Sequence, residues 1–318
     1  MLPSTALVDR LTGAIGRVII GQHVLVERLL AGLLAGGHLL LEGPPGVAKT
    51  LAVRTLAQTL HLTFQRIQFT PDLLPADITG TPVYNPRLGT FDVHKGPIFA
   101  NIVLADEVNR APAKVHSALL EVMQEHRVTI GDASFPLDEP FLVLATQNPF
   151  DHEGTFPLPE AQLDRFFMQV LVPYPTRDEE CRIVRLHLDG EPAVTEAVAD
   201  WGNIAHAREE MRGVVLADRV LDYILAIVAA TREPARAGLD RLAGRVRFGA
   251  SPRAALHLAR AARAHAYLSG RGHVLPQDVK TLASDVLAHR LVLAFEAEAD
   301  GIGPRDVIRQ ILAKVAVP

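Results

Sequence analysis

The 318-residue sequence predicts an α/β domain built on a parallel sheet, followed by a smaller all-helical domain. Short apolar runs alternate with segments of helical period up to about residue 172, which is typical of a parallel sheet with helices on both faces. The segment Pro173-Tyr174-Pro175 then interrupts this alternation, and nearly every later segment has helical period. We therefore expect the α/β domain to span residues 1–172 and the helical domain to span residues 173–318.

Hydrophobic periodicity and turn residues locate the individual elements. In the first domain we expect strands at 38–41, 64–69, 102–105, 141–146 and 168–172, and helices at 24–35, 49–60 and 113–125. Residues 127–136 predict a hairpin that turns at Gly131-Asp132. Residues 70–97 predict a long loop with a hairpin around Gly89. In the second domain we expect helices at 177–188, 193–211, 218–231, 252–268, 276–289 and 304–315.

The composition is that of an ordinary globular protein, with 48% hydrophobic and 21% charged residues and a formal charge of -4. The single cysteine, Cys181, excludes a disulfide within the chain and a cysteine-based zinc site. The charge and the 5% aromatic content do not favour binding to nucleic acid. We see no secretory signal, and the longest apolar stretch is too short to span a bilayer, so we expect a cytoplasmic protein.

The stretch LEGPPGVAKT, residues 41–50, nearly matches the phosphate-binding loop G-x-x-x-x-G-K-[ST]. It follows an apolar run and precedes a helix, so backbone N–H groups and the helix N-terminus can surround phosphate oxygens. Lys49 would contact the β- and γ-phosphates of ATP, and the hydroxyl group of Thr50 would bind Mg²⁺. The residues expected to bind the nucleotide here are Gly43, Pro44, Pro45, Gly46, Val47, Ala48, Lys49, Thr50 and Leu51.

Ala48 occupies the position at which the general motif has a second glycine. We expect Ala48 to have a negative φ, because it leads directly into the helix that begins at Lys49, and a methyl group is tolerated there. Gly43 and Gly46 lie in the turn itself. At these two positions we expect a positive φ or a close approach of the phosphates.

Polar residues follow two of the predicted buried strands. Asp106 and Glu107 end the run IVLADE, where Asp106 would hold the Mg²⁺ and Glu107 would orient and deprotonate the attacking water. Asn148 ends the run LATQN and could polarise the same water, although an asparagine there could also simply turn the chain before Pro149.

Two arginines and one apolar segment are further candidates. Arg165 ends a predicted short helix and could be an arginine finger or form a surface ion pair with Glu160 or Asp164. Arg253 lies in the first turn of a helix, where the dipole disfavours a cation, and this suggests an external anionic partner such as a phosphate. The segment IIGQ at 19–22 could form an apolar wall for the adenine; its candidate residues are Ile20, Gly21 and Gln22.

Together these segments resemble the AAA+ ATPases, and among them the MoxR family of the helix-2-insert clade. The resemblance covers nearly the whole chain and is carried by IIGQ, GPPGVAKT, QFTPDLLPADITG at 68–80, GPIFANIVLADEVNRAPAKVHSALLEVMQE at 96–125, LATQNPFDHEGTFPLPEAQLDRF at 144–166, GASPRAAL at 249–256 and DVKTLASDVLAHRLVL at 278–293. Members of this family carry alanine before the loop lysine, so Ala48 fits. The implied fold is a P-loop NTPase core with a helical lid.

The resemblance implies roles that spacing alone does not. Arg165 would be an arginine finger that acts on the ATP of a neighbouring subunit, with Arg110 as a second candidate for that contact. Arg253 would be the sensor-2 arginine and Asn148 the sensor-1 residue. The insertion at 70–97 would face a ring pore or a client. MoxR proteins are chaperone-like machines that form rings, expected to be hexamers, and often act with a von Willebrand factor A-domain protein to mature or insert metal into another complex.

Two other functions remain open from the sequence. A DNA motor or loader is favoured by residues 231–272, which hold nine arginines against Glu233 and Asp240, a net of +7 (9 − 2). The hairpin near Gly131 argues against it, because acidic residues lie beside its turn. A nucleotide-gated adaptor with little hydrolysis is the second alternative, and the intact set Lys49, Asp106 and Glu107 argues against that one.

Overall fold

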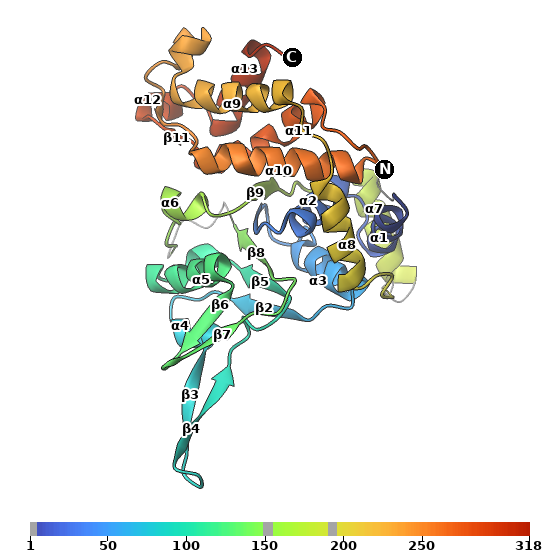
Figure 1. Cartoon of the computed structure of the whole chain (residues 1–318), viewed down its shortest axis with the longest axis vertical. Coiled ribbons are helices and arrows are strands. Elements are labelled where there is room, and N and C mark those ends of the chain that lie inside the picture. Colours follow the sequence, from blue (N-terminus) through green and yellow to red (C-terminus); the bar gives the residue numbers. More distant parts are fainter. Residues whose placement is uncertain (1–4, 149–154, 190–195) are drawn as a thin grey trace.

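The computed structural model describes residues 5–148, 155–189 and 196–318. Its centre is a five-stranded sheet in which every pair of neighbours is parallel (Figure 1). The strands are β1 (Leu39–Glu42), β2 (Phe64–Gln68), β5 (Ile102–Asp106), β8 (Leu142–Gln147) and β9 (Met168–Leu171), in the order β2-β5-β8-β1-β9. The predicted parallel sheet is therefore confirmed, and β1, which lies between β8 and the edge strand β9, places the phosphate-binding loop at the carboxyl edge of the sheet.

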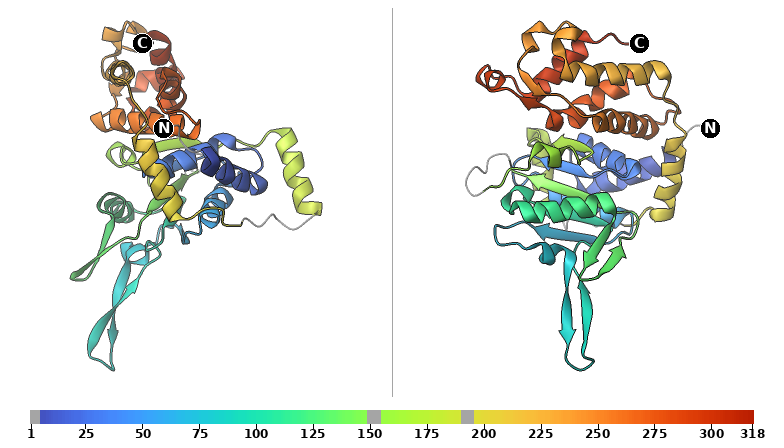
Figure 2. Two further views of the ribbon diagram at one scale, coloured as in Figure 1. Left: turned by 45° about the vertical axis from the view of Figure 1, so that its right-hand side comes forward. Right: turned by 60° about the vertical axis from the view of Figure 1, so that its left-hand side comes forward.

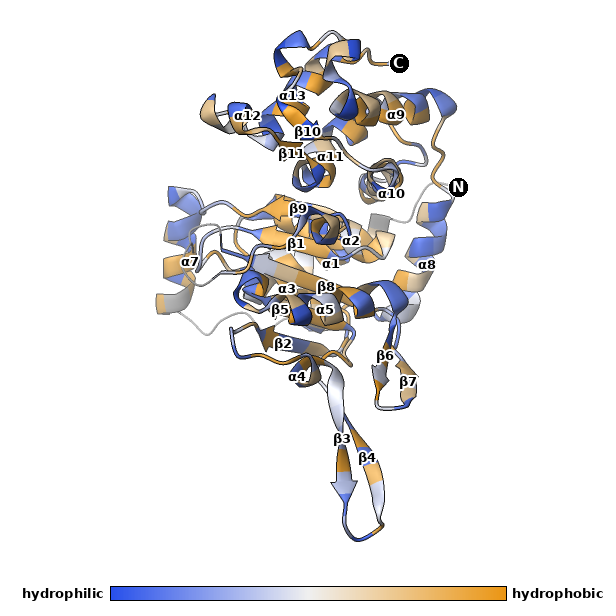
Figure 3. Ribbon diagram, turned by 90° about the vertical axis from the view of Figure 1, so that its left-hand side faces the viewer, coloured by the Kyte–Doolittle hydropathy of each residue, from blue (hydrophilic) through white to orange (hydrophobic). Residues whose placement is uncertain are grey.

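Alternate side chains of the strands enter cores on the two faces of the sheet, as strand geometry requires. Leu39 and Leu41 pack in the core formed with α1 (Thr5–Val18), α2 (His23–Ala35) and α3 (Lys49–Thr59). Leu40 belongs to the opposite core, which is formed with α5 (Ala113–Glu125). Strands β9, β1 and β8 are accordingly mostly hydrophobic (Figure 3).

Two antiparallel hairpins extend from the α/β domain. The predicted turn at Gly131-Asp132 joins β6 (Arg127–Ile130) to β7 (Ala133–Pro136). The segment 70–97 contains α4 (Pro75–Thr79), β3 (Gly80–Asn85) and β4 (Thr90–Lys95), and its hairpin projects far from the rest of the molecule (Figures 1 and 2). The hairpin around Gly89 is thus confirmed, whereas α4 was not predicted.

The second half of the chain is mainly helical. It contains α9 (Asp218–Arg232), α10 (Pro252–Leu268), α11 (Pro276–Leu287), α12 (Phe295–Ala299) and α13 (Pro304–Lys314). A small antiparallel pair, β10 (Val246–Phe248) and β11 (Val292–Leu293), corrects the expectation of an all-helical domain. Short 3-10 helices complete the chain at Val108–Arg110, Pro234–Ala237, Asp240–Leu242 and Ala288–Arg290.

Helix α7 (Arg177–Asp189) lies apart from the other late helices, whereas α8 (Trp201–Arg212) contacts α10. Figure 2 shows α7 on the far side of the α/β domain, and α8 packs beside α2. The helix predicted at 193–211 begins at Trp201, and its first three positions lie outside the described residues. The domain boundary at residue 172 stays a prediction.

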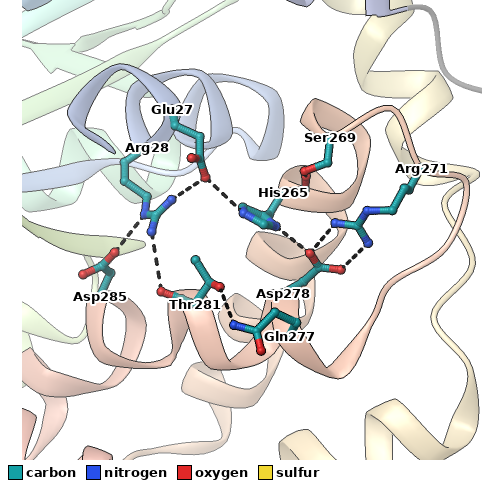
Figure 4. A network of polar contacts seen from close by, with 9 residues as sticks. All are labelled: Glu27, Arg28, His265, Ser269, Arg271, Gln277, Asp278, Thr281 and Asp285. Atoms are coloured by element: carbon teal, nitrogen blue, oxygen red, sulfur yellow. Dashed lines mark hydrogen bonds and ion pairs between the residues drawn. The ribbon is translucent and has the colours of Figure 1, made fainter. Parts of the chain in front are cut away.

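A buried polar network fastens the late helices to the α/β domain (Figure 4). Arg28 of α2 is 4% exposed and donates from Nε to Asp285 Oδ2 at 2.8 Å. His265 of α10 lies between Glu27 of α2, at 3.3 Å, and Asp278 of α11, at 2.6 Å. Because removing one partner of a buried ion pair is costly, these contacts hold the two parts of the chain in one arrangement.

No helix within the described ranges is long and apolar enough to cross a membrane.

Candidate ATP-binding site

The phosphate-binding loop turns between β1 and α3 with two residues in the left-handed region. Gly46 has a φ of 83° and Ala48 a φ of 62°. The expectation of a negative φ at Ala48 is therefore wrong. Ala48 is the N-cap of α3, and the left-handed turn extends up to the first residue of the helix. A side chain in this conformation costs about 1–2 kcal/mol, which gives a physical reason for the glycine of the general motif.

Gly43 and Gly46 are needed for different reasons. The φ of Gly46 is positive as predicted, and a Cβ atom built on it meets no atom within 4 Å, so this part of the loop forms an open cradle. Gly43 does not have a positive φ. A Cβ atom there would lie 2.3 Å from the carbonyl oxygen of Val172, so glycine is required by the close approach of the chain after β9.

The loop lines a cleft of about 380 Å³ at the carboxyl ends of β1, β5 and β8. The structure brings the predicted residues Lys49, Thr50, Asp106, Glu107 and Asn148 together there. The other residues that line it are Pro45, Gly46, Ala48, Leu51, Arg66, Thr146 and Gln147. Of the predicted loop residues, Gly43, Pro44 and Val47 lie in the turn but are not among those lining the cleft. Residues 149–154 of the predicted LATQNPFDHEGTF segment lie outside the described part of the chain.

Lys49 is the cation that the loop places at the cleft. Its Nζ donates a hydrogen bond to the carbonyl oxygen of Gly43 at 2.5 Å. Burial lowers the pKa of Lys49, and the nearby carboxylates of Asp106, Glu107 and Glu42 oppose that shift. The ammonium group of Lys49 therefore lies between the phosphate-binding loop and the nearby carboxylates. This is the position from which it can contact the β- and γ-phosphates.

Asp106 is held on both carboxylate oxygens. The hydroxyl group of Thr146 donates to Oδ1 at 2.5 Å, and Arg66 donates to Oδ2 from Nε at 2.8 Å and from Nη2 at 2.6 Å. The guanidinium group of Arg66 is thus a cation bound to the carboxylate predicted to bind Mg²⁺. Nothing in the local pattern of β2 marked Arg66, and only the pairing of β2 with β5 brings it to Asp106.

Thr146 also orients Glu107. Its hydroxyl oxygen accepts a hydrogen bond from the backbone N–H of Glu107 at 2.8 Å, and Glu107 has a φ of 56°. The Oε2 atom of Glu107 accepts from Gln68 at 2.8 Å and lies 3.2 Å from Arg110 Nε. Thr146 lies two residues before the predicted Asn148 and was not singled out from the sequence.

The donor set fits a magnesium–nucleotide complex. Mg²⁺ at such sites is usually bound by one or two protein groups together with phosphate oxygens and waters, and Thr50 and Asp106 supply two groups at one cleft. Among the residues that the structure describes, no cluster of three or more His, Cys, Asp or Glu side chains could hold a metal ion.

The predicted adenine wall borders this region without lining the cleft. Gln22 Nε2 donates to the carbonyl oxygen of Pro173 at 2.9 Å, one residue beyond the Val172 that packs on the loop. A Cβ atom on Gly21 would lie 2.3 Å from Glu179 Oε1. Gly21 lines a different cavity, of about 240 Å³, between α1, α2 and the end of α10, and Ile20 is not among the residues that line the ATP cleft.

Comparison with known proteins decides the family. The chain is 50% identical to chaperone MoxR1 of Mycobacterium tuberculosis over 310 residues, which cover 98% of this chain and 82% of that protein. The chain belongs to the MoxR family of AAA+ ATPases. It is 33% identical to protein MoxR of Paracoccus denitrificans, with 96% of this chain and 94% of that protein covered.

Family and structural matches agree with this assignment. Residues 38–168 match the ATPase family associated with various cellular activities (AAA), and residues 240–311 match the AAA lid domain. The crystal structure of a candidate ATPase from Cytophaga hutchinsonii superposes with a TM-score of 0.93 at 48% identity, covering 99% of this chain and 96% of that one. The MoxR chain is therefore an ATPase with a parallel α/β core and a lid.

The two arginines assigned by resemblance, Arg165 and Arg253, are not among the residues that line the ATP cleft. Asp164 follows α6 (Glu160–Leu163) and accepts hydrogen bonds from Ser251 Oγ at 3.0 Å, Arg253 Nη1 at 3.2 Å and Arg290 Nε at 2.9 Å. Arg165 is the next residue. Within this chain Arg253 contacts the carboxylate of Asp164, and its contact with a phosphate stays a prediction.

Most arginine side chains of the basic segment 231–272 contact acceptors within the chain. Six of its nine arginines contact acceptors of the same chain: Arg232 with the Ala250 carbonyl, Arg236 with Glu233, Arg245 with Asp300, Arg253 with Asp164, Arg260 with the Ala35 carbonyl and Arg271 with Asp278. Most of the arginines in this segment therefore have partners within the chain, which weakens the argument for a DNA motor.

Proposed function

We propose that this MoxR ATPase works as a ring, expected to be a hexamer, in which ATP bound by one subunit is completed by Arg165 and Arg253 of the next. The observation that carries the proposal is the separation of the two groups. Lys49, Asp106 and Glu107 converge on one cleft, whereas Arg165 and Arg253 do not line it, and Arg253 contacts Asp164, the residue before Arg165. A ring brings such surfaces of successive subunits together.

Each cleft residue has a distinct role in hydrolysis. The loop amides and Lys49 bind the β- and γ-phosphates of ATP. Glu107, oriented by Thr146, accepts a proton from the attacking water, while Asn148 positions that water. The water oxygen forms a bond to the γ-phosphorus, the bond to the bridging oxygen breaks, and ADP and phosphate leave. Thr50 and Asp106 would hold Mg²⁺, which would neutralise charge on the phosphate oxygens.

The arginine contact is tested by mixing two inactive variants. Arg165→Ala should keep ATP binding and lose most turnover, because an arginine finger is worth roughly 10³–10⁵ in rate. Glu107→Gln should be inactive for a different reason. Mixed rings of the two should regain activity, because a Glu107→Gln subunit can supply Arg165 to the intact cleft of its neighbour. Arg309→Ala, which changes an arginine with a 77% exposed side chain on α13, is the control.

Two results would contradict this assignment. One is near-wild-type turnover of Arg165→Ala alone. The other is a mixture that stays as inactive as its two components although both assemble. Arg110 makes the contact between subunits instead if activity returns when Glu107→Gln is mixed with Arg110→Ala but not when it is mixed with Arg165→Ala.

We further propose that the ring acts as a chaperone on a client protein, together with a von Willebrand factor A-domain partner, in its maturation or metal insertion. The name of MoxR1 supports the chaperone role, and the projecting β3–β4 hairpin offers a contact surface. Its side chains Tyr84, Leu88 and Phe91 are 55%, 71% and 67% exposed, and the rings of Tyr84 and Phe91 lie 5.3 Å apart. Exposed aromatic side chains are typical of contact surfaces for other proteins.

The client is sought by capture with Glu107→Gln held in the ATP-bound state. A specific partner should be lost when Tyr84 and Phe91 are both replaced by serine. It should be kept when Val24 and Phe295, exposed apolar residues elsewhere, are replaced in the same way. Equal capture by both double variants would remove the hairpin from client binding.

A further inference from the structure

A second polar cavity lies far from the ATP cleft. It has a volume of about 350 Å³ and is bounded by the end of α2, by α8 and α10, and by the segments that precede β6 and β8. Its charged and titratable lining residues are Arg208, Arg212, Arg260, Arg263, Glu139 and His126. None of them belongs to the proposed ATP site.

This cavity and the ATP cleft lie at opposite ends of the parallel strands. Gly36 and Phe141, which line this cavity, precede β1 and β8, whereas the phosphate-binding loop and Asn148 follow the same two strands. Because β8 has six residues, at about 3.3 Å of rise each the two ends of the sheet are roughly 20 Å apart. A ligand in this cavity would therefore be a second ligand.

Two of the arginines are held rigidly in place. Arg208 donates from Nε and Nη2 to the carbonyl oxygen of Leu33, at 3.1 and 2.8 Å, and stacks on the ring of Trp201 at 4.7 Å. Arg260 donates to the carbonyl oxygen of Ala35. Both therefore satisfy the last carbonyl groups of α2, and their guanidinium planes are fixed before any ligand arrives.

Positive charge at the cavity exceeds negative charge. Glu139 is the one carboxylate in its lining; it lies 3.4 Å from Arg208 and 3.3 Å from His126. Arg212, at the rim, pairs with the exposed Glu209. Burial lowers the pKa of both Arg208 and Arg260. Glu139 opposes this shift at Arg208, and the neighbouring Arg212 lowers the pKa of both groups further.

Arg263 is the fourth arginine of the lining, and it carries a buried donor. Its Nε atom is buried and has no hydrogen-bond partner in the part of the chain that the structure describes. A buried donor without an acceptor costs about 1–3 kcal/mol, so such groups are rare unless a ligand or water satisfies them. Arg263 as a residue lines the cavity, together with Arg208, Arg212 and Arg260.

We propose that this cavity binds a small anion with two adjacent phosphoryl groups, either free pyrophosphate or the diphosphate of a nucleotide. Guanidinium groups match phosphate oxygens in paired, planar hydrogen bonds, and four of them converge here. The size of the cavity suits a small molecule, and the convergence of the arginines into a pocket does not suit an extended nucleic acid. The bound anion would join α8 and α10 to the end of α2. This proposal does not depend on the chaperone role.

The test uses pyrophosphate and full-length Lys49→Ala protein, in which the ATP cleft lacks its lysine. Isothermal titration should show one pyrophosphate site. Adding Arg212→Gln and Arg263→Gln should weaken its binding at least tenfold. The matched control adds Arg219→Gln and Arg309→Gln, which remove two exposed charges elsewhere and should leave the affinity unchanged. Inorganic phosphate should bind at least tenfold more weakly than pyrophosphate.

Thermal unfolding separates a ligand site from a merely structural cluster. Without ligand, the Arg212→Gln and Arg263→Gln changes should not lower Tm, because they relieve repulsion among the guanidinium groups. Pyrophosphate should raise Tm of the Lys49→Ala protein but not of the cavity variant. The proposal fails if Lys49→Ala does not bind pyrophosphate, if both double variants bind it equally, or if phosphate binds as tightly as pyrophosphate.

Discussion

Replacing Ala48 by glycine is expected to stabilise the protein while leaving ATP binding largely intact. Ala48 has a φ of 62°, and relief of that conformation returns about 1–2 kcal/mol. The greater freedom of glycine in the unfolded chain offsets about 0.5–1 kcal/mol of this gain. The net change is about 0–1.5 kcal/mol in favour of the glycine variant, which corresponds to a rise in Tm of at most roughly 6 °C for a folding unit of this size.

Two neighbouring glycines provide the comparison. Gly46→Ala introduces the same strain at a φ of 83°, and its methyl group points into the open cradle, so it should lower Tm slightly and weaken ATP binding clearly. Gly43→Ala places a Cβ atom 2.3 Å from the Val172 carbonyl oxygen and should destabilise the protein most. Differential scanning fluorimetry and titration with a fluorescent ATP analogue measure both quantities. A lower Tm for Ala48→Gly, or unimpaired ATP binding by Gly46→Ala, would refute this placement of the strain.

Three further predictions follow from the described contacts. Glu107→Gln should bind ATP but not hydrolyse it, and full turnover in a phosphate-release assay would remove Glu107 from the role of base. Arg66→Ala should lower the Mg²⁺ concentration for half-maximal ATPase activity by up to about five-fold, because Arg66 competes with the metal for Asp106 and an ion pair with an exposed partner is worth about 0.2–1 kcal/mol. A higher Mg²⁺ requirement in this variant would contradict the prediction. Burial lowers the pKa of His38 to about 4. As the pH falls below 6.5, the unfolded state therefore binds the proton before the folded state does, and the free energy of unfolding falls by about 3 kcal/mol by pH 4. Urea unfolding between pH 7 and 4.5 should show a smaller loss for His38→Asn than for wild type, and equal losses would show that His38 does not contribute.

The central sheet was predictable because its strands are buried on both faces. Runs such as Ile102–Asp106 are fully buried and therefore almost continuously apolar, and the turn residues at their ends are polar. Helix α1 was missed although one of its faces is apolar, since Gly13 and Gly16 weaken its local helical preference. Strands β10 and β11 have three and two residues, too few for an alternating pattern to be visible.

The conformation of Ala48 shows why a residue type does not determine a local geometry. Alanine strongly prefers a negative φ, and the helix that follows favours the same region. The path of the loop between β1 and α3 nevertheless imposes the left-handed conformation, because the chain must turn from a buried strand into the first turn of α3. Tertiary constraints override a preference of this size, which is small beside the energy of packing the sheet.

The positions of Arg165 and Arg253 depend on contacts between residues far apart in the sequence. Asp164 binds Ser251, Arg253 and Arg290, and so attaches the loop that carries Arg165 to the first turn of α10. No local pattern specifies that attachment, so the sequence could assign both arginines to ATP without showing that they lie outside the cleft of their own chain. Because one carboxylate anchors both segments, a neighbouring γ-phosphate that attracts Arg253 would also move the loop of Arg165. Under the proposed function, loss of that phosphate on hydrolysis would therefore release the finger and the lid together.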